Sequence, residues 1–216
     1  MVNSKKEKVK EIIKRLKKEY PSAKIALNFN TPLDLLVATI LSAQCTDERV
    51  NKLTEKLFQK YKTARDYANA EISKFEQEIK STGFYKNKAR NIISTCKIIA
   101  SQYRGKVPDN MEELLKLPGV ARKTANIVLA NAYDVIVGIP VDTHVRRLSQ
   151  RLGLTKNDDP NKIEQELLQI VPKKEWKKFP YLLIDHGRAV CNAKKPLCQK
   201  CVLQDLCDYY KETVKK

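Results

Sequence analysis

The apolar residues of this 216-residue chain recur at helical spacing, and no long stretch alternates apolar and polar residues as a half-buried strand would. The chain has only six glycines, so it is poor in the residue that tight turns use most. Its first apolar stripe ends at Pro21 and consists of Val9, Ile12, Ile13, Leu16 and Tyr20. The pattern predicts an all-α fold.

Further helices are expected at regular intervals along the chain. One begins at Thr31-Pro32-Leu33-Asp34, where a hydroxyl N-cap, a proline in the first turn and an early acid occur together. Residues 133–140 are apolar enough for a buried strand, and we interpret them as an extended crossover between two helical lobes. The other helices are predicted over residues 47–61, 66–80, 86–103, 110–117, 121–133, 143–152, 162–171 and 176–186.

The charge of the chain points to an anionic partner. Lysine and arginine total 42 against 25 aspartates and glutamates, a formal net charge of +17 spread along the sequence. Nucleic acid is the first candidate for such a basic chain. The alternative is a proteome rich in lysine, in which solvated faces are basic without a partner.

Membrane insertion and export are not expected. The longest apolar stretch, residues 33–41, contains Asp34 and is far shorter than the roughly 20 residues that a membrane span needs. The N-terminus lacks an apolar signal region, and its glutamates argue against a transit peptide. We therefore expect a reducing, cytoplasmic compartment, which suits Cys45 and Cys96 as free thiols.

Four cysteines near the C-terminus have the spacing C-x6-C-x2-C-x5-C: Cys191, Cys198, Cys201 and Cys207. Thiolates packed into so short a segment can hold a [4Fe–4S] cluster or a tetrahedral zinc ion. Two disulfides are disfavoured because a chain of this size folds without them and no secretory leader is present. The spacing favours a metal centre and leaves iron–sulfur and zinc both open.

A second motif is Leu117-Pro118-Gly119-Val120-Ala121-Arg122-Lys123-Thr124-Ala125. One helix is expected to end at Leu117, and a tight Pro-Gly turn leads directly into the next. Successive backbone N–H groups at a helix N-terminus bind a phosphate without reading sequence. The alternative is that the turn only joins two helices.

Asp142, within Val141-Asp142-Thr143-His144, follows about twenty residues later. It stands where an N-cap would be, and capping is its structural interpretation. Its chemical interpretation is a carboxylate aimed at a reaction centre, with Lys123 presented by the neighbouring helix. A lysine amine is a nucleophile only when neutral, and burial or a helix N-terminus favours that form.

Taken together, these motifs resemble those of endonuclease III, an iron–sulfur DNA glycosylase family of the helix-hairpin-helix superfamily. The matching stretches follow the family's order and cover most of the chain. They are LSAQCTDERVN (41–51), STGFYKNKARNI (81–92), LPGVARKTANIVL (117–129), VDTHVRRL (141–148) and HGRAVCNAKKPLCQKCVLQDLC (186–207). The resemblance favours a [4Fe–4S] cluster over zinc.

The resemblance implies two helical lobes with a DNA-binding cleft between them. Residues 23–134 would form a six-helix barrel domain that contains the helix-hairpin-helix, residues 111–132. Residues 1–22 and 135–216 would form the iron–sulfur domain, with the cluster loop at 191–207. A monomer is expected, acting on double-stranded DNA that contains damaged bases or abasic sites, in a prokaryotic-type cytoplasm and associated with the nucleoid.

The implied activity is a bifunctional DNA glycosylase and abasic-site lyase of base-excision repair that removes oxidised pyrimidines such as thymine glycol. Lys123 would attack C1′ of the damaged nucleotide and form a Schiff base, and β-elimination would then nick the strand. Asp142 would stabilise the charge that develops on the sugar. The alternatives are a thymine-mismatch glycosylase and a non-catalytic, cluster-bearing DNA-binding protein.

Gln44 matches the glutamine that fills the gap left by the flipped nucleotide, and Phe84 stands where the family usually has a leucine wedge. Their structural alternatives are a polar helix residue and a core aromatic. His144 is expected near the substrate sugar or in a packing contact, and His186 is expected to be structural. Further DNA contacts are expected from Gly119, Ala121, Arg122, Thr124, Lys194 and Lys195.

Three residues depart from the family pattern. Ala121 replaces the usual second glycine of the hairpin, and its amide can bind phosphate only if the backbone there needs no positive φ. Phe84 is bulkier than leucine, so the preference for the base opposite the lesion can differ. Cys45 stands where a small residue is common and is expected to be a buried small hydrophobe.

Overall fold

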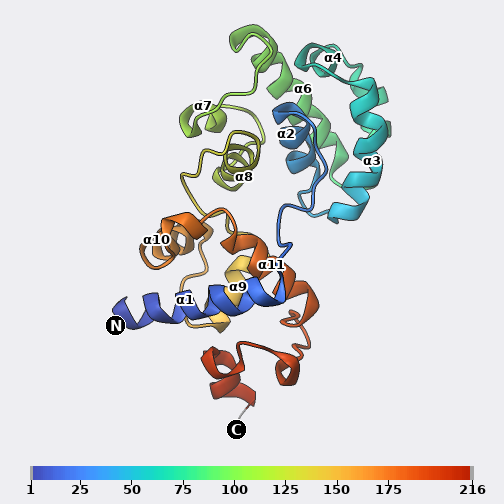
Figure 1. Ribbon diagram of the computed structural model, residues 1–216. Coiled ribbons are helices and arrows are strands. Elements are labelled where there is room, and N and C mark those ends of the chain that lie inside the picture. The colour runs from blue at the N-terminus through green and yellow to red at the C-terminus, as the bar shows by residue number, and fades with distance from the viewer. Residues whose placement is uncertain (1, 215–216) are drawn as a thin grey trace. The chain divides into compact units, whose positions relative to one another are not determined.

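The computed structural model describes residues 2–214 and is built from helices joined by turns and irregular segments (Figure 1). No strand occurs among those residues, which confirms the all-α prediction. No helix in this part of the chain combines the length and the apolar composition that crossing a membrane requires.

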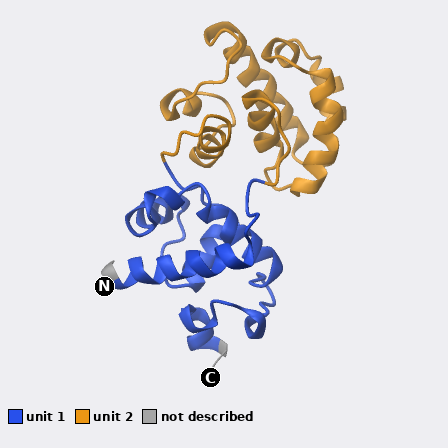
Figure 2. Cartoon of the chain, in the orientation of Figure 1, with its two compact units in different colours: residues 1–25, 138–216 blue, residues 26–137 orange. Residues whose placement is uncertain are grey.

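The chain divides into two compact units (Figure 2). Unit 1 combines the N-terminal residues up to Ile25 with the residues from Gly138 onward, and unit 2 is Ala26–Val137. The chain thus leaves unit 1 after its first helix and returns to it for the C-terminal third.

The core of unit 1 forms around α1 (Val2–Glu19). Val9, Ile12 and Leu16 are fully buried, as the stripe predicted. The helix contacts α10 (Pro160–Ile170) and α11 (Phe179–Ala189), and α11 in turn contacts α9 (Thr143–Arg151). An amphipathic helix is stabilised mainly by burying its apolar face in this way.

Unit 2 is built around α2 (Pro32–Leu41), which is buried along nearly its whole length. Thr31 caps the start of this helix as predicted, and Asp34, predicted only as an early acid, completes a capping box with it. This central helix contacts three others: α3 (Asp47–Lys60), α6 (Tyr85–Gln102) and α8 (Arg122–Ala132).

The single helix predicted over residues 66–80 is wrong. The segment forms α4 (Ala64–Ala68), α5 (Ile72–Glu78) and the 3-10 turn η1 (Lys80–Thr82). A capping box between Thr63 and Asp66 starts α4. Because the helix is broken here, Tyr67 and Phe75 pack in one aromatic cluster, and their ring centroids lie 5.9 Å apart.

Two other predictions need adjustment. The helix predicted over residues 176–186 is α11, which begins at Phe179 and has Pro180 in its first turn, where a proline fits. It is preceded by the 3-10 turn η2 (Lys173–Glu175). The strand alternative for residues 133–140 fails, because no ladder forms there and Val135 and Val137 are 37% and 42% exposed.

Candidate active-site residues and the cysteine pocket

The Pro-Gly turn joins α7 (Met111–Leu115) to α8 and is held from α6. The Thr95 hydroxyl donates to the carbonyl of Pro118 over 2.7 Å. Gly119 has a φ of +76°, and a Cβ there would lie 2.7 Å from the side-chain nitrogen of Asn91. Glycine is therefore required at this position both by the backbone and by the close approach of Asn91.

Ala121 meets the condition set for a phosphate-binding amide. It is the N-cap of α8, with φ −89° and ψ 170°, so no glycine is needed there. No side chain caps this helix end. The N-terminus of α8 thus presents backbone N–H groups from an exposed turn.

Lys123 lies in the first turn of α8, between Arg122 and Thr124. Its side chain is exposed, whereas those of its two neighbours are half-buried. The burial expected for this amine is therefore absent, and the residue lies at the N-terminus of α8. Lys123 belongs to unit 2.

Asp142 belongs to unit 1 and is the N-cap of α9. Its Oδ1 accepts from the backbone N–H of Val145 over 2.8 Å, and its Oδ2 lies 3.2 Å from Nδ1 of His144. The capping interpretation is therefore correct and accounts for one oxygen. The second oxygen forms an Asp–His pair that the sequence did not predict, although the two residues are only two positions apart in the motif.

Gln44 and Phe84 share an uncommon backbone conformation. Their φ values are 53° and 49°, in the left-handed region that non-glycine residues seldom adopt. Gln44 is exposed in the turn after α2, and Phe84 is 64% exposed as the N-cap of α6. Neither structural alternative holds, since Gln44 lies outside a helix and Phe84 outside the core.

Cys45 is half-buried in the turn that contains Gln44, so the expectation of a buried small hydrophobe is wrong. The turn between α2 and α3 runs over the surface, which leaves this side chain partly accessible. Cys96 is buried within α6, and burial raises the pKa of its thiol to about 12.

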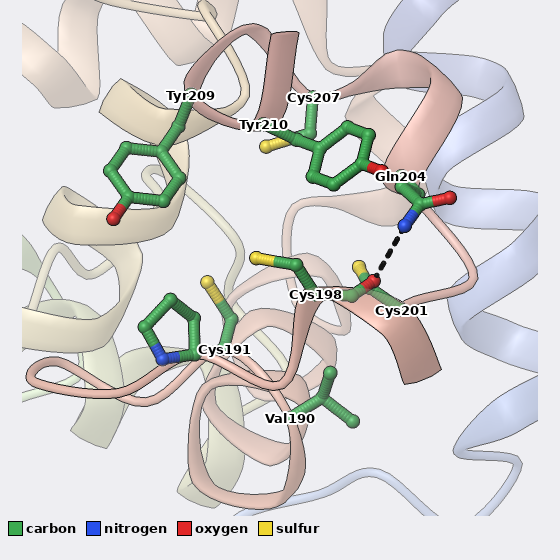
Figure 3. Close-up of a pocket in the computed structure, with 9 residues that line it drawn as sticks. Val190, Cys191, Cys198, Cys201, Gln204, Cys207, Tyr209 and Tyr210 are labelled. Carbon is green, nitrogen blue, oxygen red and sulfur yellow. Dashed lines mark hydrogen bonds between the residues drawn. The ribbon is translucent and has the colours of Figure 1, made fainter. Parts of the chain in front are cut away.

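The four C-terminal cysteines line one pocket with Val190, Pro196, Gln204, Tyr209 and Tyr210 (Figure 3). The segment that carries Cys198, Cys201 and Cys207 is folded by three short helical turns, η3 (Cys198–Lys200), η4 (Gln204–Leu206) and η5 (Tyr210–Val214). Gln204 donates from Nε2 to the carbonyl of Cys198 over 3.1 Å, which ties two of the turns together.

Arg151 fixes this segment from α9. Its guanidinium donates to the sulfur of Cys191 over 3.2 Å and to the carbonyls of Asn192 and Ala193 over 2.8 and 2.9 Å. Arg147, one turn earlier, donates to the carbonyl of Cys191 over 3.1 Å. Neither arginine was predicted from the sequence, where the available signal was their spacing four residues apart after Asp142.

His186 links the cysteine pocket to α1. Its Nε2 lies 3.3 Å from the sulfur of Cys201, and its Nδ1 lies 3.1 Å from the hydroxyl of Tyr20. The side chain is buried, and burial lowers its pKa to about 4, so the imidazole is neutral near pH 7. The residue sits inside the core of unit 1, in the structural position expected from the sequence.

The chemistry of the pocket fits a thiolate-bound metal group. Burial raises the pKa of Cys201 to about 11 and also raises those of Cys198 and Cys207, so a metal must displace their protons when it binds. The Arg151 cation and the Leu203 N–H, 3.4 Å from the Cys201 sulfur, are donors suited to thiolates. Across residues 2–214, no three His, Cys, Asp or Glu side chains are grouped closely enough to hold a single metal ion.

Lys194 and Lys195 are exposed on the loop between the first two cysteines of the pocket, and Lys200 is exposed beside the third. Their ammonium groups therefore lie on the surface of unit 1, next to a segment that is fixed by hydrogen bonds.

Comparison with known proteins places these features in a family. The HhH-GPD superfamily of base excision DNA repair proteins matches residues 37–173. The chain is 56% identical over 204 residues to endonuclease III of Synechocystis, covering 94% of this chain and 93% of that protein. It is 46% identical to endonuclease III of Bacillus subtilis, covering 87% of this chain and 86% of the relative.

Solved structures agree. An endonuclease III bound non-covalently to DNA is 43% identical, has a TM-score of 0.93 and covers 98% of this chain and 99% of its own. A thermostable thymine-DNA glycosylase is 25% identical, has a TM-score of 0.86 and covers 97% of this chain and 98% of its own. Sequence and structure therefore agree that the chain belongs to the endonuclease III family of helix-hairpin-helix base-excision repair proteins.

Proposed function

We propose that this protein is a bifunctional DNA glycosylase and abasic-site lyase that removes oxidised pyrimidines, such as thymine glycol, from double-stranded DNA. The observation that carries the proposal is the near-complete match to endonuclease III, including the solved DNA complex. The exposure of Lys123, in the first turn of α8, supports the proposal that its amine is the nucleophile.

The proposed nucleophile is the neutral amine of Lys123. It attacks C1′ of the damaged nucleotide, the glycosidic C–N bond breaks, and the base leaves with the electron pair and takes up a proton. Loss of the amine proton and opening of the sugar ring give a Schiff base. Loss of a proton from C2′ then expels the 3′ phosphate, and water releases the lysine from the nicked strand.

Asp142 is proposed to stabilise the positive charge that develops on the sugar and to help activate the lysine. A fixed carboxylate is effective in this role because it needs no reorganisation as the charge forms. The bond from Val145 to Oδ1 holds the group in place. His144, paired with Oδ2, is proposed to lie near the same sugar.

DNA contacts are proposed at two kinds of position. The target nucleotide must leave the stack before C1′ can be reached. Gln44 is proposed to fill the gap and Phe84 to separate the opposite strand, as their exposure and left-handed backbones allow. The proposed contacts with the phosphate backbone involve Gly119, Ala121, Arg122, Thr124, Lys194 and Lys195.

Cys191, Cys198, Cys201 and Cys207 are proposed to hold a [4Fe–4S] cluster, whose contribution would be to make the C-terminal segment rigid. Iron and acid-labile sulfide analysis of the purified protein tests this assignment. Four irons and four sulfides per chain are expected, and one zinc ion without sulfide would contradict it.

The two units are proposed to correspond to two domains. Unit 2 would be the barrel domain with the helix-hairpin-helix, and unit 1 the iron–sulfur domain. We further propose that the protein acts as a monomer in a prokaryotic cytoplasm, associated with the nucleoid.

A thymine-mismatch glycosylase is the second candidate, favoured by the similarity to the thermostable thymine-DNA glycosylase. Single-turnover assays on two duplexes separate the candidates, one with a thymine glycol and one with a G·T mismatch. Faster base release from thymine glycol, followed by strand cleavage, is expected. Faster release from the mismatch would favour the second candidate, and no release from either would favour a non-catalytic DNA-binding protein.

A further inference from the structure

Lys88 is a buried lysine that the proposed chemistry does not use. It lies in the first turns of α6 and is only 4% exposed. Burying an ammonium group costs free energy, which an apolar side chain of similar length would avoid. A buried lysine therefore indicates that its donors serve a specific contact.

The Lys88 ammonium joins two turns that are distant in sequence. Its Nζ donates to the carbonyl of Leu41 and to the carbonyl of Thr82, each over 2.8 Å. The distance between the two carbonyl oxygens therefore cannot exceed the combined length of these two bonds. Both are buried bonds to a charged donor, the class of hydrogen bond that contributes most to stability.

Each of these carbonyls belongs to a residue that begins a turn with a proposed DNA-contacting residue in it. Leu41 ends α2 and opens the Gln44 turn, residues 41–46. Thr82 ends η1 and opens the Phe84 turn, residues 82–84, in which Gly83 and Phe84 both have positive φ. A single ammonium group thus fixes the base of both turns.

Lys88 is also tied to Phe84 through the main chain. Its backbone N–H donates to the carbonyl of Phe84 over 3.1 Å. Burial lowers the pKa of Lys88, and the opposing influence comes from Cys45, the residue after Gln44. Lys88 therefore contacts or lies close to both turns from one position in α6.

A left-handed backbone at a non-glycine residue is strained and persists only when its surroundings enforce it. Gln44 and Phe84 are both in this conformation and both exposed, so their own side chains supply little of the restraint. The Lys88 ammonium group instead holds the residues at which the two turns begin, Leu41 and Thr82.

We propose that Lys88 is a positioning residue: its ammonium group locks the Gln44 and Phe84 turns together, so that both side chains are preorganised to enter the DNA as one unit. The inference rests on the proposed DNA contacts of Gln44 and Phe84. Misplacement of a site by about 1 Å can cost 100-fold in rate, so a loosened pair of turns should impair excision from duplex DNA.

The test uses the full chain and a duplex with a tetrahydrofuran abasic analogue opposite 2-aminopurine, whose fluorescence rises when the base is unstacked. Wild type is compared with Lys88→Met, Gln44→Ala and Phe84→Ala. Lys97→Met serves as the matched control, because Lys97 is an exposed lysine on the same helix. Circular dichroism checks that each variant is folded.

At saturating protein, Lys88→Met is expected to lose at least half of the fluorescence rise, as are Gln44→Ala and Phe84→Ala, while Lys97→Met retains it. Strand cleavage at an abasic site in single-stranded DNA, which needs no unstacking of a partner, should change less than twofold in Lys88→Met. A fall confined to duplex DNA would not follow from general loss of structure.

Different outcomes test the positioning role of Lys88 and the proposed DNA contacts of Gln44 and Phe84. A normal rise in Lys88→Met, with losses in Gln44→Ala and Phe84→Ala, would overturn the positioning role alone. A normal rise in all three would overturn the proposed DNA contacts and the inference with them. If Lys88→Met fails to fold, Lys88→Gln decides, since its shorter amide cannot reach both carbonyls, and a full rise in that variant would overturn the inference.

Discussion

Asp142 divides its two carboxylate oxygens between separate partners, one on the backbone of α9 and one on His144. A capping role and a catalytic role are therefore combined in one side chain. They can be separated because asparagine caps a helix about as well as aspartate but carries no charge.

We predict that Asp142→Asn lowers the single-turnover rate of base release by about 100-fold or more, the size of effect seen when one preorganised electrostatic partner is removed. Its free energy of unfolding should stay within about 0.5 kcal/mol of wild type, whereas Asp142→Ala should lose about 1 kcal/mol more. Quench-flow kinetics and urea unfolding measure the two effects. A fully active Asp142→Asn would remove the carboxylate from the mechanism.

Gly119 illustrates a second kind of constraint at the residue scale. Gly119 and Gly105 have nearly the same φ, +76° and +78°, but a Cβ would meet Asn91 only at Gly119. Comparing the two positions therefore separates backbone strain from the steric contact.

We predict that Gly105→Ala lowers the free energy of unfolding by about 1 kcal/mol, the cost of a left-handed alanine. Gly119→Ala should cost more, about 2–3 kcal/mol, because Asn91 must also move. Urea unfolding monitored by circular dichroism gives both values. Equal losses would show that Asn91 yields without cost.

At the scale of single elements, helix capping decides where helices begin. The Thr63–Asp66 capping box starts α4. The hydrogen bond that the backbone N–H of Thr63 donates to Asp66 is the main reason why the pKa of this carboxyl lies below its ordinary value of 3.8. Since the folded pKa is lowered, the stabilisation is present above pH 3.8 and is lost as the pH falls through the folded pKa.

We predict that Asp66→Ala lowers the free energy of unfolding at pH 7 by about 1 kcal/mol. The difference from wild type should shrink as the pH is lowered below 3.8, because a protonated Asp66 is a weaker acceptor. Urea unfolding at pH 7 and at pH 3 measures it. A difference that does not change with pH would assign the effect to packing rather than to the cap.

Helices were predictable where local chemistry is sufficient. The Thr31 N-cap and the stripe of α1 are properties of a few neighbouring residues, and both were found as predicted. The break between α4 and α5 was missed because it depends on Tyr67 and Phe75 meeting in the core, which is a tertiary contact.

The same distinction applies to the candidate site. The cysteines, Lys123 and Asp142 were proposed from motif spacing, and their site roles stay predictions. The left-handed backbones of Gln44 and Phe84 were not, because φ at these positions is set by the packing around the turns. Lys88 was missed because a lysine within a helix normally indicates a solvated face, and only the fold shows that it is buried.

At the scale of the whole molecule, the net charge of +17 dominates the expected interaction with DNA. Each phosphate that the protein neutralises releases counterions, so the logarithm of the binding constant should fall linearly with the logarithm of the salt concentration, by about 0.9 per phosphate.

We predict that the double variant Lys194→Ala/Lys195→Ala weakens non-specific binding and makes this slope shallower by roughly 1 to 2. Fluorescence anisotropy titrations between 50 and 300 mM salt measure the slope, with Lys97→Ala as a control on another surface. An unchanged slope would place these two lysines outside the DNA interface.

The central claim is that Lys123 forms a Schiff base with damaged DNA, and borohydride trapping on a duplex with one thymine glycol tests it most directly. A covalent protein–DNA band is predicted for wild type and none for Lys123→Ala. A band in both would move the nucleophile to another amine, and no band in either, with DNA binding intact and no trapping on an abasic-site duplex, would contradict the proposed lyase chemistry.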